Sequence, residues 1–141
     1  MSNEFEKYDE FAKQMEERFP KMFTEPYGGF AVGEGWWPIL TNLCANIQHH
    51  LNWKNKTSEV VTQVTVAQIK EKFGGLRFYY NGGDDEIRGM VRMAEAWAGN
   101  SCEECGAPGT SRSGGWIKTL CDTHEAERQL KRKEHENLCN Q

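Results

Sequence analysis

The first hydrophobic pattern along the chain has a helical period. Between residues 5 and 19 the apolar side chains recur at steps of three and four residues, and Pro20 ends the run. Asn3 followed by Glu6 resembles a capping box, in which each end of the motif satisfies a free backbone N–H group. The sequence therefore predicts an amphipathic helix that begins just after Asn3.

Two further helices are predicted by the same period. One begins at Pro38, because proline fits the first turn of a helix, where its missing N–H group costs nothing. Its buried face would be Leu40, Leu43, Cys44, Ile47 and Leu51. The other is capped by Asp84 or Asp85 and ends at Gly99. Its core face would be Ile87, Met90, Val91, Ala94 and Trp97.

From Val60 the period changes to two, which is typical of a β-strand, and the pattern continues to Phe73. The pair Gly74-Gly75 predicts a hairpin turn. On the return strand Leu76, Phe78 and Tyr80 would share one face, and Arg77 and Tyr79 the other. Together these elements predict an α+β fold in which helices pack on a small antiparallel sheet. We expect a common core of Trp36, Leu40, Leu43, Ile47, Val64, Val66, Leu76, Phe78, Val91 and Trp97.

Length and composition indicate one domain, or a small domain with a metal-stabilised appendage. The 141 residues are 38% hydrophobic, which is enough to bury a core. No apolar run is long enough to cross a bilayer, and the acidic N-terminus lacks the apolar region of a signal peptide. With five cysteines, four of them in or near a metal pattern, we expect a reducing compartment and a cytoplasmic protein. The net charge of −4 argues against nonspecific coating of duplex nucleic acid, but leaves a local basic pocket open.

Two pairs of metal-capable side chains lie in the C-terminal third, in CEECG and CDTH. They are Cys102, Cys105, Cys121 and His124. Each pair encloses two residues, and the fifteen residues between the pairs fall at the short end of the range for a zinc module with four ligands. The alternative is four residues that merely pack, since cysteine is often buried. We predict one structural zinc ion, because four protein ligands leave no place for a catalytic water.

The surroundings of these ligands predict a treble-clef-like module. A knuckle that turns at Gly106 would be followed by a short hairpin turning at Gly114-Gly115. A helix capped by Asp122 would then supply the last ligands from its first turn. We therefore expect an α+β core domain at residues 1–100 and a zinc-binding module with a C-terminal helix at residues 101–141.

The predicted hairpin KEKFGGLRFYY combines cations with aromatic rings. Lys70, Lys72 and Arg77 would flank Phe73 and Tyr79, a combination suited to contacts with phosphates and bases. The alternative is a solvated strand face, on which Arg77 pairs with a neighbouring carboxylate. The sequence leaves both interpretations open.

The segment GGFAVGEGWW is the second candidate for phosphate binding. Backbone N–H groups around Gly33 and Gly35, ahead of a helix, could cradle a phosphate, although the lysine and hydroxyl of a P-loop are absent. The alternative, which we favour, is a tight turn that brings Trp36 and Trp37 into the core. In the C-terminal helix basic residues alternate with glutamates, which favours a solvated helix over a nucleic-acid site.

Catalysis has little support in the sequence, and whether the protein is an enzyme is left open. A zinc-dependent nuclease of the HNH type needs a histidine on the hairpin, and residues 106–120 contain none. The adjacent His49 and His50 would point about 100° apart on a helix and cannot form a paired metal site by themselves. Binding is therefore the leading hypothesis.

Three motifs together, GWWPIL, QIKEKFGGLRFYY and CEECGAPG…GWIKTLCDTH, resemble a family of small, mostly uncharacterised proteins of bacteriophages and prophages. The resemblance covers roughly residues 28–125 and implies phage infection as the context, without a mechanism. It suggests an accessory protein in the host cytoplasm that captures a phosphate-bearing ligand, either a nucleotide or nucleic acid, and so counters a host defence. An inhibitor that binds a host defence or regulatory protein directly is the alternative, and a zinc-dependent nuclease is the second. A homo-oligomer is left open.

Overall fold

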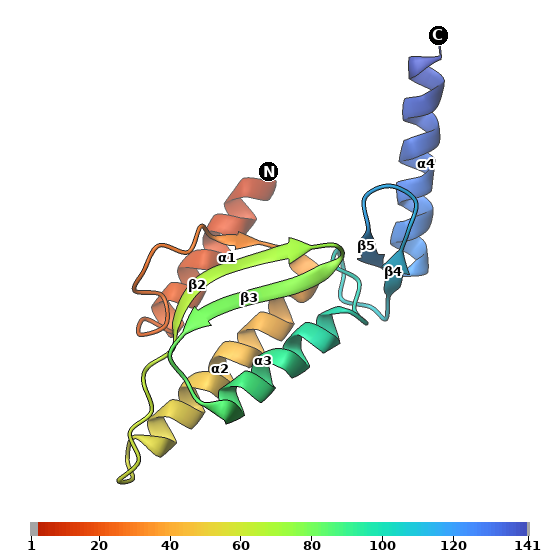
Figure 1. The fold of residues 1–141 in the computed structure, drawn as a ribbon. Coiled ribbons are helices and arrows are strands. Elements are labelled where there is room, and N and C mark those ends of the chain that lie inside the picture. The colour runs from red at the N-terminus through yellow and green to blue at the C-terminus, as the bar shows by residue number, and fades with distance from the viewer. Residues whose placement is uncertain (1–2, 141) are drawn as a thin grey trace.

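The computed structural model describes residues 3–140 and shows an α+β fold (Figure 1). The elements are α1 (Glu4–Arg18), β1 (Phe30–Ala31), the 3-10 helix η1 (Glu34–Trp36), α2 (Trp37–Lys54), β2 (Thr65–Lys72), β3 (Gly75–Asn81), α3 (Asp85–Ala98), β4 (Thr110–Arg112), β5 (Lys118–Leu120) and α4 (Asp122–Cys139). In Figure 1, α2 and α3 run side by side beneath β2 and β3. Helix α4 extends away from the rest of the chain.

The larger sheet has the strand order β1-β2-β3 and is mixed rather than antiparallel. Strands β2 and β3 form the expected antiparallel hairpin, in which Ile69 pairs with Phe78. Strand β1 lies parallel to β2, with Phe30 beside Ile69. The sequence did not reveal β1 because a strand of two residues has no alternation to detect, and a parallel partner lies far away in sequence. Strands β4 and β5 form a separate antiparallel pair.

The hairpin turn lies one residue earlier than the sequence predicted. Lys72 pairs with Gly75, so the two turn residues are Phe73 and Gly74 rather than Gly74 and Gly75. Their φ angles are +54° and +79°. A two-residue turn with positive φ at both positions follows the right-handed twist of the strands, which explains why the chain uses it. The β2 strand also begins later than predicted, at Thr65 rather than Val60.

The helix starts are largely as predicted, with one correction. Asn3 accepts a hydrogen bond from the Glu6 N–H, and Asp84 accepts one from the Ile87 N–H. The cap of α4, however, is Cys121 rather than Asp122, because the Cys121 sulfur accepts a hydrogen bond from the N–H of the residue three positions later. One of the four predicted metal ligands thus also starts the helix.

The hydrophobic core lies between the sheet and α1, α2 and α3. Nine of the ten expected core residues are buried. The prediction for Trp97 is wrong, because 50% of this residue is exposed. The buried face of α3 consists of Ile87, Val91, Ala94 and Ala98, and Trp97 lies beside that face. A second, smaller cluster joins Cys102, Leu120 and Cys121. The boundary near residue 100 falls between the two clusters, but the division into two domains stays a prediction.

None of the helices in residues 3–140 combines the length and the apolar character that crossing a membrane requires.

Candidate metal centre and basic face

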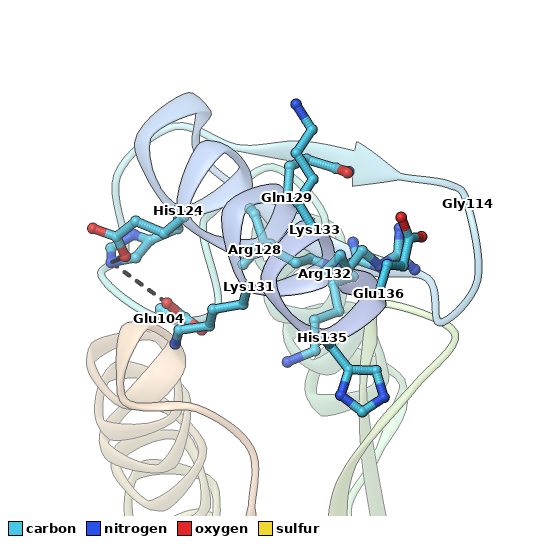
Figure 2. Close-up of a pocket in the computed structure, with 13 residues that line it drawn as sticks. Glu104, Gly114, His124, Arg128, Gln129, Lys131, Arg132, Lys133, His135 and Glu136 are labelled. Atoms are coloured by element: carbon cyan, nitrogen blue, oxygen red, sulfur yellow. Dashed lines mark ion pairs between the residues drawn. The ribbon is translucent and has the colours of Figure 1, made fainter. Parts of the chain in front are cut away.

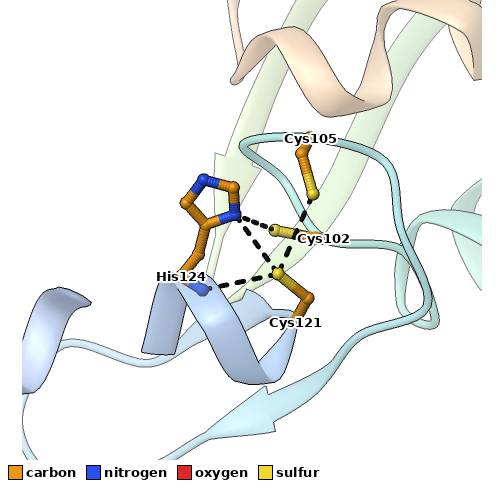
Figure 3. A group of neighbouring side chains, drawn as sticks. All are labelled: Cys102, Cys105, Cys121 and His124. Carbon is orange, nitrogen blue, oxygen red and sulfur yellow. Dashed lines mark hydrogen bonds between the residues drawn. The ribbon is translucent and has the colours of Figure 1, made fainter. Parts of the chain in front are cut away.

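The four predicted metal ligands converge on one point (Figure 3). Cys102 and Cys105 come from the knuckle after α3, Cys121 follows β5, and His124 lies in the first turn of α4. The Cys105 and Cys121 sulfurs are 3.8 Å apart, and the Cys102 sulfur is 3.5 Å from Nδ1 of His124. All four ligand atoms lie within 4.8 Å of one another, so the cluster could hold a metal ion.

The knuckle is shaped by its own backbone. The Gly106 N–H donates to the Cys102 carbonyl at 2.8 Å, and the Cys102 N–H donates to the Ala107 carbonyl at 2.7 Å. Gly106 has a φ of +81°, a conformation that glycine adopts without strain. This turn directs both sulfurs of the knuckle toward the same point.

Cys121 is prepared to act as a thiolate. A hydrogen bond from the backbone N–H of His124 is the main cause that lowers the pKa of the Cys121 thiol to about 7. The start of α4 is also the positive end of the helix dipole, which favours a negative charge there. A metal therefore competes with fewer protons for this sulfur at neutral pH than it would for an ordinary thiol.

His124 has a carboxylate partner on its second ring nitrogen. Its Nδ1 faces the sulfurs, whereas its Nε2 lies 3.4 Å from a carboxylate oxygen of Glu104 (Figure 2) and 4.0 Å from one of Glu127. Such carboxylates hold a metal-binding imidazole in the correct tautomer and orientation. Neither glutamate was predicted from the sequence, although Glu104 lies inside CEECG and Glu127 lies three residues after His124.

The knuckle is docked on the glycine-rich loop through Glu103. The Gly35 N–H donates to the Glu103 carbonyl at 2.7 Å, and the Gly33 N–H donates to the Glu103 carboxylate at 2.9 Å. Burial raises the pKa of this carboxyl, and the Gly33 N–H opposes the shift. Because Glu103 engages both N–H groups, neither is free to bind a phosphate. The Trp36 ring is fully buried, as the tight-turn interpretation expected, and its Nε1 donates to the Ser101 carbonyl at 2.9 Å. Trp37 packs against the core but is only partly buried.

The region around the cluster of three cysteines and one histidine also contacts the tip of the β2–β3 hairpin. The Thr119 hydroxyl in β5 donates to the Gly74 carbonyl at 2.6 Å. Gly74 is buried, and a Cβ at this position would lie 3.2 Å from the Ile117 side chain. The hairpin turn is therefore held on one side by the segment that also carries Cys121.

The predicted ligand-binding residues of the hairpin lie together on its outer face, away from α2 and α3. We call Lys70, Lys72, Phe73, Arg77 and Tyr79 the basic face. Lys70 lies directly opposite Arg77, and its Nζ is 5.8 Å from the centre of the Tyr79 ring. The Lys72 Nζ is 5.5 Å from the centre of the Phe73 ring.

The cations of the basic face have no carboxylate partners. In residues 3–140, Lys70, Lys72 and Arg77 form no ion pair. Glu71, the nearest acid in sequence, pairs with Leu76 on the opposite face, and its carboxylate accepts the Gly74 N–H at 2.7 Å. The alternative in which a neighbouring carboxylate neutralises Arg77 therefore has no support.

A cleft of about 460 Å³ extends the basic face along the edge of β3 toward α3. Arg88 and Arg92 of α3 line it together with Arg77. The one acid in its lining is Glu95, whose carboxylate accepts the Phe78 N–H at 3.0 Å. Neither arginine was predicted from the sequence, because the spacing of residues along the chain does not show how closely α3 packs beside β3.

A larger cavity, of about 780 Å³, lies beside α4 (Figure 2). Its lining mixes cations such as Lys131 and Arg132 with anions such as Glu127 and Glu136. The lining has five lysines and arginines against three glutamates, so its charge is more mixed than in the cleft beside β3, where Glu95 is the one acid. This mixture agrees with the solvated helix that the sequence favoured.

His50 has a structural position. It is buried, and its Nε2 and Nδ1 lie 2.7 Å and 3.2 Å from the carboxylates of Asp84 and Glu86. Partial burial alone would raise the pKa of Asp84, but hydrogen bonds from His50 and from the Ile87 N–H outweigh it and lower that pKa. These contacts tie α2 to the start of α3.

Comparison of the chain with models of protein families, with curated proteins and with solved structures found no match. The cluster of three cysteines and one histidine and the basic face are therefore the two candidate functional sites.

Proposed function

We propose that this protein captures a phosphate-bearing ligand, a nucleotide or nucleic acid, on its basic face. The main support is the pair Lys70 and Arg77, which lie opposite each other on neighbouring strands and have no carboxylate partner. Like charges in such a cross-strand pair destabilise a sheet. A bound phosphate would remove the repulsion and would form charge-assisted hydrogen bonds with Arg77.

The cluster of three cysteines and one histidine is proposed to hold zinc. Zinc–sulfur bonds of about 2.3 Å in a tetrahedron place two sulfurs about 3.8 Å apart, and a sulfur and a nitrogen about 3.5 Å apart. The distances of 3.8 Å and 3.5 Å in the cluster agree with this geometry, and the 3.2 Å between the Cys121 sulfur and Nδ1 of His124 is about 0.3 Å shorter. The order of knuckle, short hairpin and helix supports a treble-clef-like module. Four protein ligands fill the coordination sphere, so the zinc-dependent nuclease finds no support here.

Zinc would serve the basic face indirectly. The module contacts the turn that carries Phe73 through the Thr119–Gly74 hydrogen bond, and it contacts the glycine loop through Glu103. Metal binding that orders the module would therefore also fix one end of the basic face. The resemblance to phage proteins supports a role as an accessory protein that acts in the host cytoplasm.

Substitution of Arg77 tests the proposal. Arg77→Ala removes a charged hydrogen-bond donor to phosphate, so binding of labelled nucleotides and oligonucleotides should weaken by about 10- to 150-fold. Arg77→Lys should be nearly as damaging, because lysine cannot form the bidentate contact. Lys56→Ala, an exposed cation on the connection between α2 and β2, is the control and should bind normally. Full binding by both Arg77 variants would eliminate the phosphate anchor.

Direct binding to a host protein is the second candidate, and one surface favours it. Met93 and Trp97 are exposed on the outer side of α3, one helical turn apart. Exposed apolar side chains gathered on one helix face are typical of protein interaction sites. If the protein acts this way, Met93→Glu would abolish capture of the host protein, whereas Arg77→Ala would leave capture intact.

A further inference from the structure

Two aromatic rings of the basic face are exposed to solvent, one at each end of its row of cations. Phe73 is 71% exposed in the hairpin turn, and Tyr79 is 44% exposed on β3. Each ring has a lysine ammonium beside it, Lys72 and Lys70 respectively. Such a pair suits a nucleotide, because its base can stack on the aromatic ring while its phosphate contacts the cation.

Phe73 occupies a position that its own side chain disfavours. Its φ of +54° lies in the left-handed region, where a bulky residue is uncommon and where asparagine or glycine is preferred in this kind of turn. Its ring is nevertheless largely outside the core. The turn requires a positive φ at this position, but it does not require an aromatic side chain. A strained residue that keeps an exposed aromatic ring is typical of a residue retained for binding.

The separation of the two rings sets the size of the ligand. Tyr79 is four residues from Gly75 on β3, which corresponds to about 14 Å of extended strand, and Phe73 lies beyond Gly75 in the turn. One base cannot reach both rings over this distance. Lys70 and Arg77 lie between the rings, where the phosphates that link two or more nucleotides would pass.

The surface is largely open to solvent. In the cleft beside β3, Lys72, Phe73, Tyr79, Arg88 and Arg92 are exposed and Arg77 is half-buried, whereas Phe78 and Val91 are buried. Pockets for small molecules instead bury most of the ligand among covered side chains. A cationic track open to solvent is suited to an extended chain that continues past both rings.

We infer that the ligand of the basic face is single-stranded nucleic acid, bound by stacking on Phe73 and Tyr79 and by phosphate contacts to the cations between them. This inference rests on the proposed function and specifies its ligand. The bases of a duplex are stacked inside and cannot reach the two rings, and the net charge of −4 opposes a duplex elsewhere on the surface.

The test measures the affinity of the full, metal-loaded chain for four probes by fluorescence anisotropy at a fixed salt concentration. The probes are a 12-nucleotide oligothymidine, the corresponding oligouridine, a mixed-sequence DNA duplex of the same length, and a labelled nucleoside triphosphate. At least one of the two single strands should bind 10-fold or more tightly than the triphosphate and the duplex. The two single-strand arms distinguish a DNA ligand from an RNA ligand.

Two variants test the stacking. Phe73→Asn gives the turn a residue that prefers its conformation, and Tyr79→Thr keeps a residue that favours strands. Each should leave the urea midpoint near that of the wild type while weakening single-strand binding by about 5- to 150-fold, the loss expected for one stacked base. The triphosphate should lose far less, because it engages one ring at most.

The outcomes separate the two proposals. If the triphosphate binds as tightly as the single strands, depends on Arg77 and ignores both aromatic variants, the inference is overturned and the proposed function stands. Two other outcomes also overturn the inference but leave the proposed function standing. One is tighter binding of the duplex, and the other is unchanged single-strand binding by folded Phe73→Asn and Tyr79→Thr. If none of the four probes binds, both proposals are overturned.

Discussion

Gly35→Ala tests how strongly the proposed metal-binding region depends on the glycine loop. A Cβ at Gly35 would lie 2.2 Å from the Cys102 carbonyl oxygen and 2.7 Å from the Cys105 backbone nitrogen. Ordinary contacts of a methyl group need more than about 3.4 Å, so the loop and the knuckle would have to separate by about 1 Å. The obstacles are backbone atoms of the knuckle, which cannot turn aside as a flexible side chain could.

The size of the effect follows from the hydrogen bonds that the separation would break. They are Gly35 N–H to the Glu103 carbonyl, Gly33 N–H to the Glu103 carboxylate, and Trp36 Nε1 to the Ser101 carbonyl. At about 0.5–1.5 kcal/mol each, their loss should lower the free energy of unfolding by roughly 2–4 kcal/mol. Because the displaced knuckle carries two of the four metal ligands, metal affinity should also fall, by at least about 10-fold.

Urea denaturation followed by tryptophan fluorescence measures the first quantity, and competition with a coloured chelator measures the second. Gly89→Ala is the matched control, because a Cβ at this position in the middle of α3 meets nothing within 4 Å. Alanine there should stabilise the protein by up to about 1 kcal/mol and leave metal affinity unchanged. A Gly35→Ala protein that stays within about 0.5 kcal/mol of the wild type and keeps its metal would refute the reasoning.

Three further predictions concern the metal, the core and the response to acid. Cys105→Ser should lose the metal in elemental analysis, whereas the exposed Cys139→Ser should retain one equivalent; metal-free wild type would contradict the site. Leu43→Ala, on the buried face of α2, should cost roughly 2–5 kcal/mol in urea denaturation, and a cost below about 0.5 kcal/mol would mean that the helix face is wrong. Asp84 has a lowered pKa, so its ionised form stabilises the fold above about pH 4, and that contribution is lost as the pH falls through the lowered value. Asp84→Asn keeps a cap on α3 and should lose less stability than the wild type over this acidic range; identical acid profiles would show that Asp84 contributes nothing.

Local pattern was sufficient for much of this protein. The spacing of Cys102, Cys105, Cys121 and His124 predicted the cluster, because two short motifs with fixed geometry each present two ligand atoms. The helical period identified the buried side of α2, and the alternation of residues 76–80 assigned Arg77 and Tyr79 to the outer face of the hairpin. These features depend on residues that are close in sequence. The regular geometry of a helix, strand or turn is enough to fix the relative positions of such residues.

Other features were decided by contacts between distant segments. The β1–β2 pairing joins Phe30 to Ile69, and Glu103 engages Gly33 and Gly35 about seventy positions earlier. Because this docking occupies the N–H groups of Gly33 and Gly35, the tertiary structure removed one of two phosphate-binding candidates that the sequence had left open. The packing of α3 beside β3 likewise brought Arg88 and Arg92 next to the basic face and left Trp97 exposed. No local period encodes the rotation or distance at which two elements pack, since these depend on how the side chains of the whole core fit together.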